Sequence, residues 1–385
     1  MRILWLSWKS ILHPDAGGAE QYGHQMAKAL VSQDHLVTWI SLSPDKWRSP
    51  FLSLRSNSTT THDNISYGFL GHRLLMYTGL FHLFVFLNYL LYWRHQFDLI
   101  IDEIHGPPLL IPLYARKPIL VVIHEVAGEI WHKTIPSPLS HFMQKFLEPL
   151  FFKAYKNQTI ITVSQSTQSD LTKLSIPTKN IHIIYNGYDA PTAQKQFPKE
   201  TRPTLIFLSE IRPMKGLDRV LKAYTLIKKS TSDVQLWIVG NDQTPYAHEL
   251  KQKIATDPSI TFFGRVSENY KYELIAKAHI LVHGSYKEGW GRVVLEANSV
   301  GTPAVVYDAD GLREAVKHHQ TGFIAHSQIE FSEYVHKLLH DTDLYQKFSI
   351  HAQQWSMQFT WESSSNKFLE IASSYALAHN KHRSV

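Results

Sequence analysis

Short apolar segments rich in Val, Ile and Leu alternate with longer amphipathic segments along almost the whole chain. The short segments have the length of strands, and the segments between them have helical periodicity. Apolar strands separated by helices are typical of parallel sheets covered on both faces. The expected strands are Arg2–Ser7, Leu36–Ser41, Leu99–Asp102, Ile119–His124, Thr159–Ser164, Ile181–Tyr185, Thr204–Ser209, Gln235–Val239, Ile260–Phe263, Ile280–His283 and Pro303–Tyr307.

The alternation stops between Ala190 and Pro203, where three prolines lie among polar residues without an apolar period. This composition is typical of a linker. We therefore predict an α/β protein with two Rossmann-like, doubly wound parallel-sheet domains, residues 1–189 and 204–355, joined by a linker and hinge at residues 190–203. A length of 385 residues fits two such domains. Residues 356–385 are expected to form an amphipathic C-terminal helix.

Two apolar segments raise the question of a membrane. Leu74–Trp93 is long enough to span a bilayer, but polar residues interrupt it and a strand follows, so we favour a buried or half-buried helix. His141–Lys156 mixes four Phe with three Lys and is expected to be an amphipathic surface helix. Its composition leaves a peripheral membrane contact open. Met1–Trp8 lacks both the long apolar run and the small-residue cleavage site of a signal peptide, so we predict a strand there.

The amino-acid composition excludes several kinds of site and partner. The chain has no Cys, which excludes disulfides, thiolate metal sites and cysteine catalysis, and fits a reducing, cytoplasmic compartment. The formal net charge of +6 suits anionic partners such as phosphates. No long Lys/Arg run or nucleic-acid motif is present, so we expect no nucleic-acid partner.

Two features of the first half follow predicted strands, where ligands bind in open α/β sheets. Gly17-Gly18 precedes a predicted helix, Tyr22–Val31. Paired glycines allow close backbone approach, and the helix N-terminus favours anions, although a simple turn explains the pair equally well. His124 ends an apolar strand and could contact a substrate hydroxyl or carry a proton, or be a structural histidine with satisfied hydrogen bonds.

The second half carries a cationic loop directly after its first strand. Arg212 and Lys215 lie in that loop, which leads into a predicted helix, Leu217–Lys228. Two cations beside a helix N-terminus can hold a diphosphate. The alternative is a pair of solvated surface cations, and the position between a strand and a helix favours the diphosphate.

The most specific motif runs from Glu288 to Glu296, after the strand Ile280–His283. Gly289 and Gly291 expose backbone N–H groups at the start of a helix predicted over Val293–Val300, where phosphate oxygens can bind. Glu288 in the loop can accept hydrogen bonds from sugar hydroxyls, and Glu296 inside the helix from ribose hydroxyls.

In this order, the motifs resemble a family 4 (group 1) retaining glycosyltransferase of the GT-B fold over nearly the whole chain. The residues that carry the resemblance are Gly17-Gly18-Ala19-Glu20, His124, Asn186-Gly187, Arg212, Lys215-Gly216, Phe263-Gly264-Arg265-Val266, and Glu288 and Glu296 with the segment that follows them.

The resemblance implies two domains that face an interdomain cleft, with the nucleotide-sugar donor held mainly by the second and the acceptor by the first. It implies retention at the anomeric carbon without a metal or another cofactor, and a C-terminal helix that crosses back to the first domain. The catalytic residues would be His124, Glu288, Arg212 and Lys215. The donor-binding residues would be Gly17, Gly18, Arg212, Lys215, Val266, Glu288, Gly289, Trp290, Gly291, Arg292, Val293 and Glu296.

The sequence departs from the family pattern at three places. Arg292 stands where an apolar residue is usual, and could contact donor phosphate, an acidic sugar or solvent. Glu125 replaces the usual Asp after His124, and Ala309-Asp310-Gly311 replaces a Gly-Gly pair near the donor sugar. Asp308 and Asp310 form a D-x-D pattern, which we interpret as a loop coincidence rather than a metal site.

The predicted activity is transfer of a sugar from a nucleoside-diphosphate sugar, with UDP favoured over GDP, to a hydroxyl of a glycan or lipid-linked glycan. This reaction would serve cell-envelope or polysaccharide biosynthesis in the cytoplasm or at the cytoplasmic face of the membrane. Two alternatives stay open: a degenerate GT-B binding subunit of a larger enzyme, and a GT-B sugar-nucleotide epimerase, which would convert its substrate without an acceptor.

Overall fold

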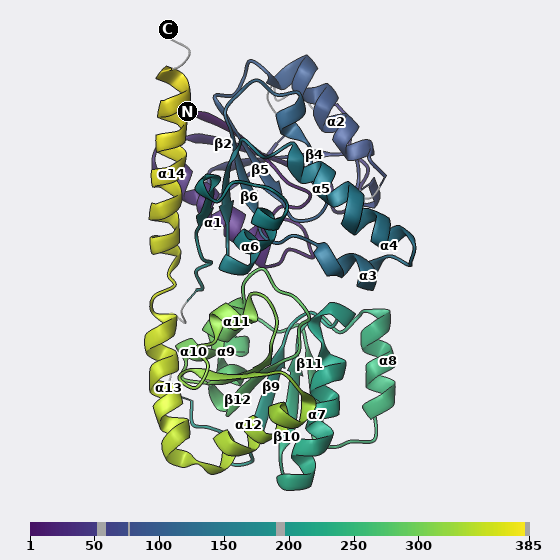
Figure 1. The fold of residues 1–385 in the computed structure, drawn as a ribbon, viewed down its shortest axis with the longest axis vertical. Helices are drawn as coiled ribbons and strands as arrows, with labels where there is room; N and C mark the ends of the chain where they lie inside the picture. The colour runs from purple at the N-terminus through teal and green to yellow at the C-terminus, as the bar shows by residue number, and fades with distance from the viewer. Residues whose placement is uncertain (52–58, 76–77, 190–196, 382–385) are drawn as a thin grey trace. The chain divides into compact units, whose positions relative to one another are not determined.

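The structure is a computed structural model that describes residues 1–51, 59–75, 78–189 and 197–381. The chain divides into two compact units (Figure 1). Unit 1 comprises Met1–Gly187 with Trp361–Val385, and unit 2 comprises Tyr188–Thr360. The C-terminal segment therefore belongs to the same unit as the first half of the chain.

Unit 1 contains an eight-stranded sheet in the order β3-β4-β2-β1-β5-β6-β7-β8. The β3–β4 pair is antiparallel, and the other described pairings are parallel. The strands are β1 (Arg2–Leu6), β2 (Leu36–Leu42), β3 (Thr60–His62), β4 (Ile65–Leu70), β5 (Leu99–Ile104), β6 (Ile119–Ile123), β7 (Thr159–Thr162) and β8 (Ile181–Ile183).

Helices cover both faces of this sheet. The α-helices are α1 (Gly18–Ser32), α2 (Leu80–Asn88), α3 (Trp131–Thr134), α4 (Leu139–Phe142), α5 (Glu148–Lys153), α6 (Gln165–Lys173) and α14 (Trp361–Lys381). Short 3-10 or π segments are η1 (Arg73–Leu75), η2 (Tyr89–Trp93), η3 (Ile111–Leu113), η4 (Gly128–Ile130), η5 (Met143–Leu147) and η6 (Thr178–Asn180). Alternate β1 side chains divide between the faces: Leu4 and Leu6 join the core under α2 and α5, whereas Trp5 stacks on Trp39 and on Phe368 of α14.

Unit 2 contains a six-stranded parallel sheet in the order β11-β10-β9-β12-β13-β14. Its strands are β9 (Thr204–Leu208), β10 (Gln235–Val239), β11 (Ile260–Gly264), β12 (Ile280–His283), β13 (Ala304–Tyr307) and β14 (Gly322–Ala325). Its helices are η7 (Pro213–Lys215), α7 (Leu217–Ser230), α8 (Pro245–Ile254), α9 (Glu268–Lys277), α10 (Arg292–Ser299), α11 (Leu312–Ala315), α12 (Gln328–His340) and α13 (Thr342–Ser356).

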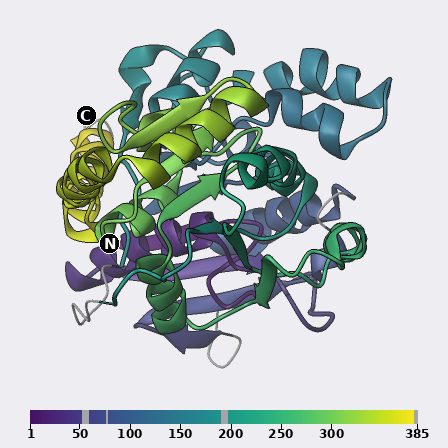
Figure 2. The same ribbon diagram turned by 90° about the horizontal axis from the view of Figure 1, so that it is seen from below.

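Helices lie on both sides of the unit 2 sheet (Figures 1 and 2). One buried cluster joins the sheet to α7, α12 and α13 through residues such as Val220, Phe331 and Phe348. A second joins it to α9, α10 and α11 through Ile275, Val294 and Leu312. Central strands that are buried on both faces explain the apolar runs in the sequence.

Each of the eleven expected strands is present, which confirms the doubly wound parallel-sheet class. Three strands were not expected: β3, β4 and β14. Strand β3 has three exposed polar residues, and Gly68 interrupts the apolar pattern of β4. Polar residues in β3 and the glycine in β4 therefore weaken the sequence signal, whereas the edge strands β8 and β11 were predicted. Strand β14 is buried but only four residues long.

The apolar segment Leu74–Trp93 is half-buried in unit 1. Its helical part, α2 with η2, buries Phe81, Val85 and Trp93, while Leu83 and Leu91 are exposed. Among the described residues, no helix has both the length and the apolar character needed to cross a membrane. The segment His141–Lys156 is helical, but it is divided among α4, η5 and α5.

The predicted linker at residues 190–203 falls partly outside the described residues, at 190–196. The predicted C-terminal helix differs in its start. Helix α13 ends at Ser356 and α14 begins at Trp361, because Phe359 packs in between against Trp290 and Trp355 of unit 2.

Candidate functional site

The strand order of unit 2 identifies where its ligand site should lie. Strands β9 and β12 are neighbours, and the order reverses between them: β10 and β11 extend to one side, β13 and β14 to the other. In open α/β sheets, ligands bind beyond the carboxyl ends of the strands at such a switch point. The loops that leave β9 and β12 hold Arg212 and Lys215, and Glu288 with the glycines that follow it.

Two glycines bring these loops into backbone contact. Gly216 has φ +64°, and a Cβ added to it would lie 1.9 Å from the carbonyl oxygen of Gly284. A Cβ on Gly284 would in turn lie 2.1 Å from the carbonyl oxygen of Gly216. No side chain fits in either place, so this pair fixes the distance between the Lys215 loop and the Glu288 loop.

Lys215 and Glu288 form an ion pair across these loops. Lys215 Nζ donates to both Oε1 and Oε2 of Glu288 at 2.8 Å. Ser285 Oγ donates to Oε1 of the same carboxylate at 2.5 Å. The Glu288 backbone N–H donates to the carbonyl of Asp310 in the loop after β13. The carboxylate is thus held from two sides, while the Lys215 side chain keeps an exposed fraction of 30%.

The electrostatics favour an ionised Glu288. Burial acts to raise the pKa of this carboxyl, but Lys215, His283 and the hydrogen bond from Ser285 outweigh burial and hold the pKa below its usual value. Burial lowers the pKa of the neighbouring His283 to about 4, so this imidazole is neutral at pH 7. The local charges at this position are therefore one ammonium and one carboxylate.

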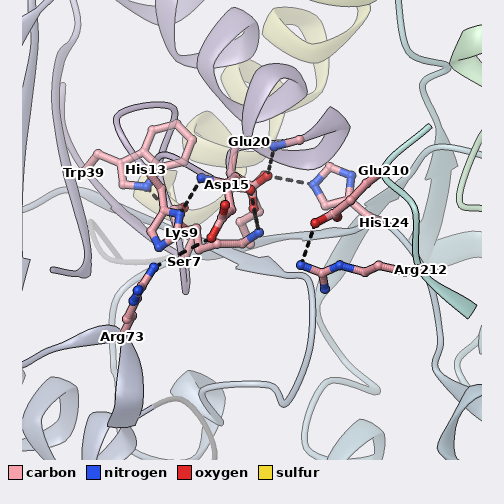
Figure 3. Close-up of polar contacts among 12 residues, drawn as sticks. Ser7, Lys9, His13, Asp15, Glu20, Trp39, Arg73, His124, Glu210 and Arg212 are labelled. Carbon is pink, nitrogen blue, oxygen red and sulfur yellow. Dashed lines mark hydrogen bonds and ion pairs between the residues drawn. The ribbon is translucent and has the colours of Figure 1, made fainter. Parts of the chain in front are cut away.

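Arg212 lies on the same loop but in a different environment. Its guanidinium pairs with Glu210 Oε1 at 2.8 Å, and its side chain is 56% exposed (Figure 3). Both cations of the loop are therefore paired with carboxylates, and both retain a solvent-facing side.

Glu296 is buried inside α10 and is held by two cations. Arg292 Nε lies 3.3 Å from its Oε1, and Lys271 Nζ from α9 lies 3.2 Å from its Oε2. Arg292 is the first residue of α10, so this contact spans one helical turn. Contact with Glu296 was not among the three contacts expected for Arg292, which were donor phosphate, an acidic sugar and solvent.

The other predicted donor residues surround the start of α10. Gly291 is its N-cap, and a Cβ there would lie 2.9 Å from Ala315 Cβ, so α11 packs directly against it. Gly289 precedes it in the loop, and Val293 follows in the first turn. Trp290 is 6% exposed and packs against Phe359. Val266 lies after β11 and packs at the edge of the same buried cluster as α9 and α10.

Unit 1 also has a switch point, between β1 and β5. Gly17 caps α1, and its N–H donates to Glu20 Oε2 at 2.6 Å, while Gly18 opens the helix. Lys9 lies 3.4 Å from the other oxygen of Glu20 (Figure 3). Burial acts to raise the pKa of Glu20, but His105, Lys9 and the Gly17 N–H lower it below its usual value. Lys9 and His105 were not predicted.

His124 ends β6 and is 4% exposed. Its Nε2 lies 2.8 Å from Glu103 Oε1, and Trp5 Nε1 donates to Glu103 Oε2 at 2.7 Å. The ring packs edge-on against Tyr22. Because Glu103 engages Nε2 and fixes the orientation of the ring, Nδ1 is the nitrogen through which His124 could meet a hydroxyl. Glu103 itself was not predicted, since a carboxylate inside an apolar strand gives no distinguishing pattern.

The two aspartates of the D-x-D pattern both accept hydrogen bonds from Arg313. Asp308 accepts from Arg313 Nε at 2.6 Å, and Asp310 from Arg313 Nη1 at 3.2 Å. The two aspartates therefore share an arginine three to five residues away, in a loop that also contacts Glu288 through the Asp310 carbonyl. Ser285, Lys271 and Gly284 complete the unit 2 site and were not predicted. The roles of Lys271 and Gly284 depend on contacts between separate segments, and Ser285 carries no pattern that marks it as a donor to Glu288.

Two family models match the chain. The model described as Glycosyltransferase Family 4 matches residues 16–190, and the model described as Glycosyl transferases group 1 matches residues 189–355. Together they include every predicted site residue.

Solved structures and curated proteins agree with these matches. The sucrose-phosphate synthase of Thermosynechococcus elongatus superposes with a TM-score of 0.76 at 16% identity, over 98% of this chain and 99% of the other. Anabaena HepE, solved in complex with UDP-glucose, gives 0.71 at 20% identity, over 97% and 100%. A GDP-mannose-dependent phosphatidylinositol monomannoside mannosyltransferase of Mycobacterium tuberculosis is 27% identical over 54% of this chain.

The chain spans about half the length of the first curated relatives, 48% of two of them and 60% of the mannosyltransferase. The two family models are adjacent and in order, the two parallel-sheet units correspond to them, and the neighbouring structures share the fold. The chain belongs to the group 1, family 4 glycosyltransferases and has the GT-B fold.

Proposed function

We propose that this protein is a retaining glycosyltransferase that moves a sugar from a UDP-sugar to a hydroxyl group of a glycan or lipid-linked glycan. The observation that carries the proposal is the Lys215–Glu288 pair, held by Ser285 at the switch point of unit 2, beside the N-terminus of α10. These groups are a cation, a carboxylate and backbone N–H donors, which a nucleoside-diphosphate sugar requires.

The chemical task is to make a nucleoside diphosphate leave an anomeric carbon. The bond between that carbon and the phosphate oxygen breaks, and negative charge grows on the leaving diphosphate. We propose that Lys215, Arg212 and the N–H groups around Gly291 stabilise this charge. Lys215 is well placed because its ammonium is already oriented by Glu288 and Ser285 and keeps one solvent-facing side.

Retention would follow from attack on the same face of the sugar. The acceptor oxygen forms a bond to the anomeric carbon as the phosphate oxygen departs, and the acceptor proton passes to that phosphate. We assign Glu288 to a hydroxyl of the transferred sugar and Glu296 to the ribose. Glu296 is paired with Lys271 and Arg292, so a ribose hydroxyl would have to share the carboxylate with these cations.

Unit 1 is proposed to bind the acceptor, with His124 directed at a sugar hydroxyl through Nδ1. Gly17 and Gly18 would allow close approach of the ligand to the backbone at the start of α1. The choice of UDP over GDP is supported by the fold neighbour that was solved with UDP-glucose. The GDP-mannose-dependent relative makes GDP the competing nucleotide.

The test is a thermal-shift series with UDP, GDP and ADP, each with and without Mg²⁺. A nucleotide at about 100 times its dissociation constant adds about 2.7 kcal/mol to the free energy of unfolding. We expect stabilisation by UDP that Mg²⁺ does not change. Stabilisation by GDP alone would reassign the donor, and a requirement for Mg²⁺ would contradict the metal-free mechanism. Absence of any shift would favour the degenerate binding subunit.

We also propose that unit 1 meets an anionic membrane surface through α4, η5 and α5. Leu139, Phe142, Phe146 and Leu150 recur at helical spacing and are each 49–64% exposed. Lys145, Lys153 and Lys156 flank them, and the acidic Glu148 of this segment is buried. Apolar side chains beside lysines suit an anionic bilayer.

If this face binds membranes, the protein should co-sediment with vesicles that contain anionic lipid and bind little to zwitterionic vesicles. Phe146→Ser with Leu150→Ser should abolish the binding, whereas Ile329→Ser, at a 64% exposed site on α12 of unit 2, should not. Equal binding by the double variant would exclude this face. It would leave the nucleotide site of unit 2 unaffected.

A further inference from the structure

Three side chains of types that can bind metals, His24, His62 and Asp63, meet at the edge of unit 1, outside every group assigned above. His24 comes from the middle of α1, and His62 and Asp63 come from the hairpin that joins β3 to β4. One ligand atom from each lies within 4.8 Å of the other two. No other group of three or more His, Asp or Glu side chains with this spacing occurs among the described residues.

The hairpin turn sets the position of the carboxylate. Asp63 and Asn64 have φ +49° and +59°, the left-handed conformation of the two central residues of a type I′ turn. The turn directs the Asp63 carboxylate toward His24 of α1. Asp63 Oδ2 lies 3.0 Å from His24 Nε2 and 4.0 Å from His62 Nε2. The two imidazole rings are stacked with centroids 5.4 Å apart.

A hydrogen bond at the second ring nitrogen orients the buried imidazole of His24. His24 is 6% exposed, and its second nitrogen, Nδ1, lies 2.7 Å from the hydroxyl of Tyr67, which is fully buried in β4. Metal-bound histidines are typically held in this way by a hydrogen bond at the other ring nitrogen, which leaves the outer nitrogen for the ion. His62 and Asp63 are 48% and 40% exposed at the side chain, so an ion can reach them from solvent.

We propose that His24, His62 and Asp63 form a binding site for a first-row divalent metal, Zn²⁺ in the first instance, with solvent water at the remaining position. Two imidazoles and one carboxylate suit Zn²⁺ better than Mg²⁺ or Ca²⁺, which prefer oxygen ligands. Zn–N and Zn–O bonds of about 2 Å place tetrahedral ligand atoms roughly 3.3 Å apart. The His24 and Asp63 atoms, 3.0 Å apart, are already near this separation, so His62 is the ligand that must move closer. The exposed His62 can supply most of this movement by rotating.

The site is structural rather than catalytic. The Asp63–Asn64 turn precedes β4, which runs parallel to β2, so the turn lies at the amino-terminal edge of the sheet. Gly17, Gly18 and Lys9 lie at the opposite, carboxyl edge. A bound ion would fasten the β3–β4 hairpin, which forms the outer end of the sheet, to α1. The metal-free transfer mechanism is therefore independent of this site.

An ion would compete with one protein cation. Lys28 Nζ lies 3.4 Å from Asp63 Oδ2, one helical turn beyond His24 on α1. The lysine side chain is 46% exposed, so it can move into solvent when a divalent ion takes the carboxylate. The alternative to a metal site is that Lys28 and His24 alone pin the hairpin through Asp63.

The test is zinc binding by the chelator-stripped protein, measured by competition with a colorimetric zinc chelator, with Co²⁺ absorption as a second readout. The variants are His62→Gln and Asp63→Asn, both at exposed positions, and Asn tolerates the left-handed conformation of residue 63. His336→Gln is the control, because His336 and His340 on α12 are a second close imidazole pair, with centroids 4.2 Å apart.

We expect one zinc equivalent in the wild type, with affinity that falls at least about tenfold in His62→Gln and Asp63→Asn but not in His336→Gln. Zinc should also raise the melting temperature of the wild type and of the control. Equal affinity in wild type and His62→Gln, or loss of the equivalent in His336→Gln, would overturn the proposal. So would the lack of a saturable zinc equivalent in the wild type.

Discussion

Lys215 Nζ lies 2.8 Å from each carboxylate oxygen of Glu288, although the two residues are 73 positions apart in the sequence. The pair links the loop after β9 to the loop after β12. Because the carboxylate also accepts from Ser285, the ammonium is held in one place before any ligand binds. A fixed ammonium at a switch point costs no rearrangement when negative charge develops beside it.

Replacing Lys215 should separate catalysis from folding. Lys215→Ala removes the cation that we assign to the leaving diphosphate, so turnover should fall by two to three orders of magnitude, about 3–4 kcal/mol in the barrier. Steady-state release of the nucleoside diphosphate measures this effect. Lys229→Ala, an exposed lysine at the end of α7, is the control and should retain full turnover.

The truncation also leaves Glu288 without its cation, so some stability should be lost. The double variant Lys215→Met with Glu288→Gln removes both charges, and its free energy of unfolding should recover toward the wild-type value. Its turnover should stay low. Recovered folding with wild-type turnover would contradict the role of both residues.

Glu288 should make the protein less stable in acid. Lys215, His283 and Ser285 hold its pKa below the usual value of 4.5 in the folded state. A depressed pKa contributes stability above the unfolded value, and this contribution is lost as pH falls through the folded pKa. The difference in free energy of unfolding between wild type and Glu288→Gln should therefore shrink as pH falls below about 4.5.

Urea denaturation at several pH values between neutral and acid measures this difference. The exposed Glu333 on α12 provides the comparison, and Glu333→Gln should follow the wild-type pH profile. A constant difference between wild type and Glu288→Gln down to the acid transition would mean that the carboxyl has an ordinary pKa.

The Gly216–Gly284 contact should tolerate no side chain. A Cβ at Gly216 would lie 1.9 Å from the Gly284 carbonyl oxygen, in a backbone with φ +64°. Gly216→Ala should therefore lower the free energy of unfolding by more than about 1 kcal/mol and weaken nucleotide binding, because the adjacent Lys215 must move. Thermal melting with and without nucleotide measures both effects.

Gly18→Ala is the matched control for stability. A Cβ at Gly18 meets nothing within 4 Å, and the residue opens helix α1. Its melting temperature should equal or exceed that of the wild type, since Ala favours helix. Equal melting temperatures for the Gly216→Ala and Gly18→Ala variants would show that the loop can shift without cost.

The central strands were predictable because they are buried on both faces and consist almost entirely of apolar residues. Strand β3 was missed because its three residues are polar and exposed, and β4 because Gly68 interrupts its apolar pattern. Strand β14 was missed because it is only four residues long and begins with a glycine. The end of each central strand also located the candidate loops, since parallel strands present their carboxyl ends at one edge. This geometry made Arg212, Lys215, Glu288 and His124 visible from the sequence.

The residues that contact these side chains could not be predicted from the sequence. Ser285 lies in the same loop as Glu288, but no sequence pattern marks it as the hydrogen-bond donor to that carboxylate. Glu103 and Lys271 become relevant only through contacts between different elements. The same holds for His24 and the His62-Asp63 pair, which α1 and a hairpin bring together. A pattern along the chain reports the local environment of a residue, but ion pairs and ligand clusters depend on the register between elements.

Asp102 provides a test of the buried polar network of unit 1. This carboxyl is fully buried in β5, and burial raises its pKa to about 7. Tyr155 donates to its Oδ2 at 2.7 Å, while Oδ1 has no hydrogen-bond partner among the described residues. The neighbouring Glu103 points to the opposite face, toward His124, and adds a smaller effect in the same direction.

A raised folded pKa means that the folded state binds more protons than the unfolded state. Stability from this group is therefore full below its usual pKa of 3.8 and is lost as pH rises through about 7. The Asp102→Asn variant keeps an acceptor for Tyr155 and has no charge to bury. Between pH 5 and pH 8, the wild type should lose about 3 kcal/mol of unfolding free energy relative to this variant.

Guanidinium denaturation of both proteins at pH 5, 6, 7 and 8 measures that difference. Asp233→Asn, at an exposed position before β10, is the control and should follow the wild type at every pH. A difference between wild type and Asp102→Asn that does not change with pH would mean that the carboxyl is ionised throughout. Because burial and the Tyr155 contact are fixed by the packing of β5, that result would require water or a cation to reach Oδ1 in solution.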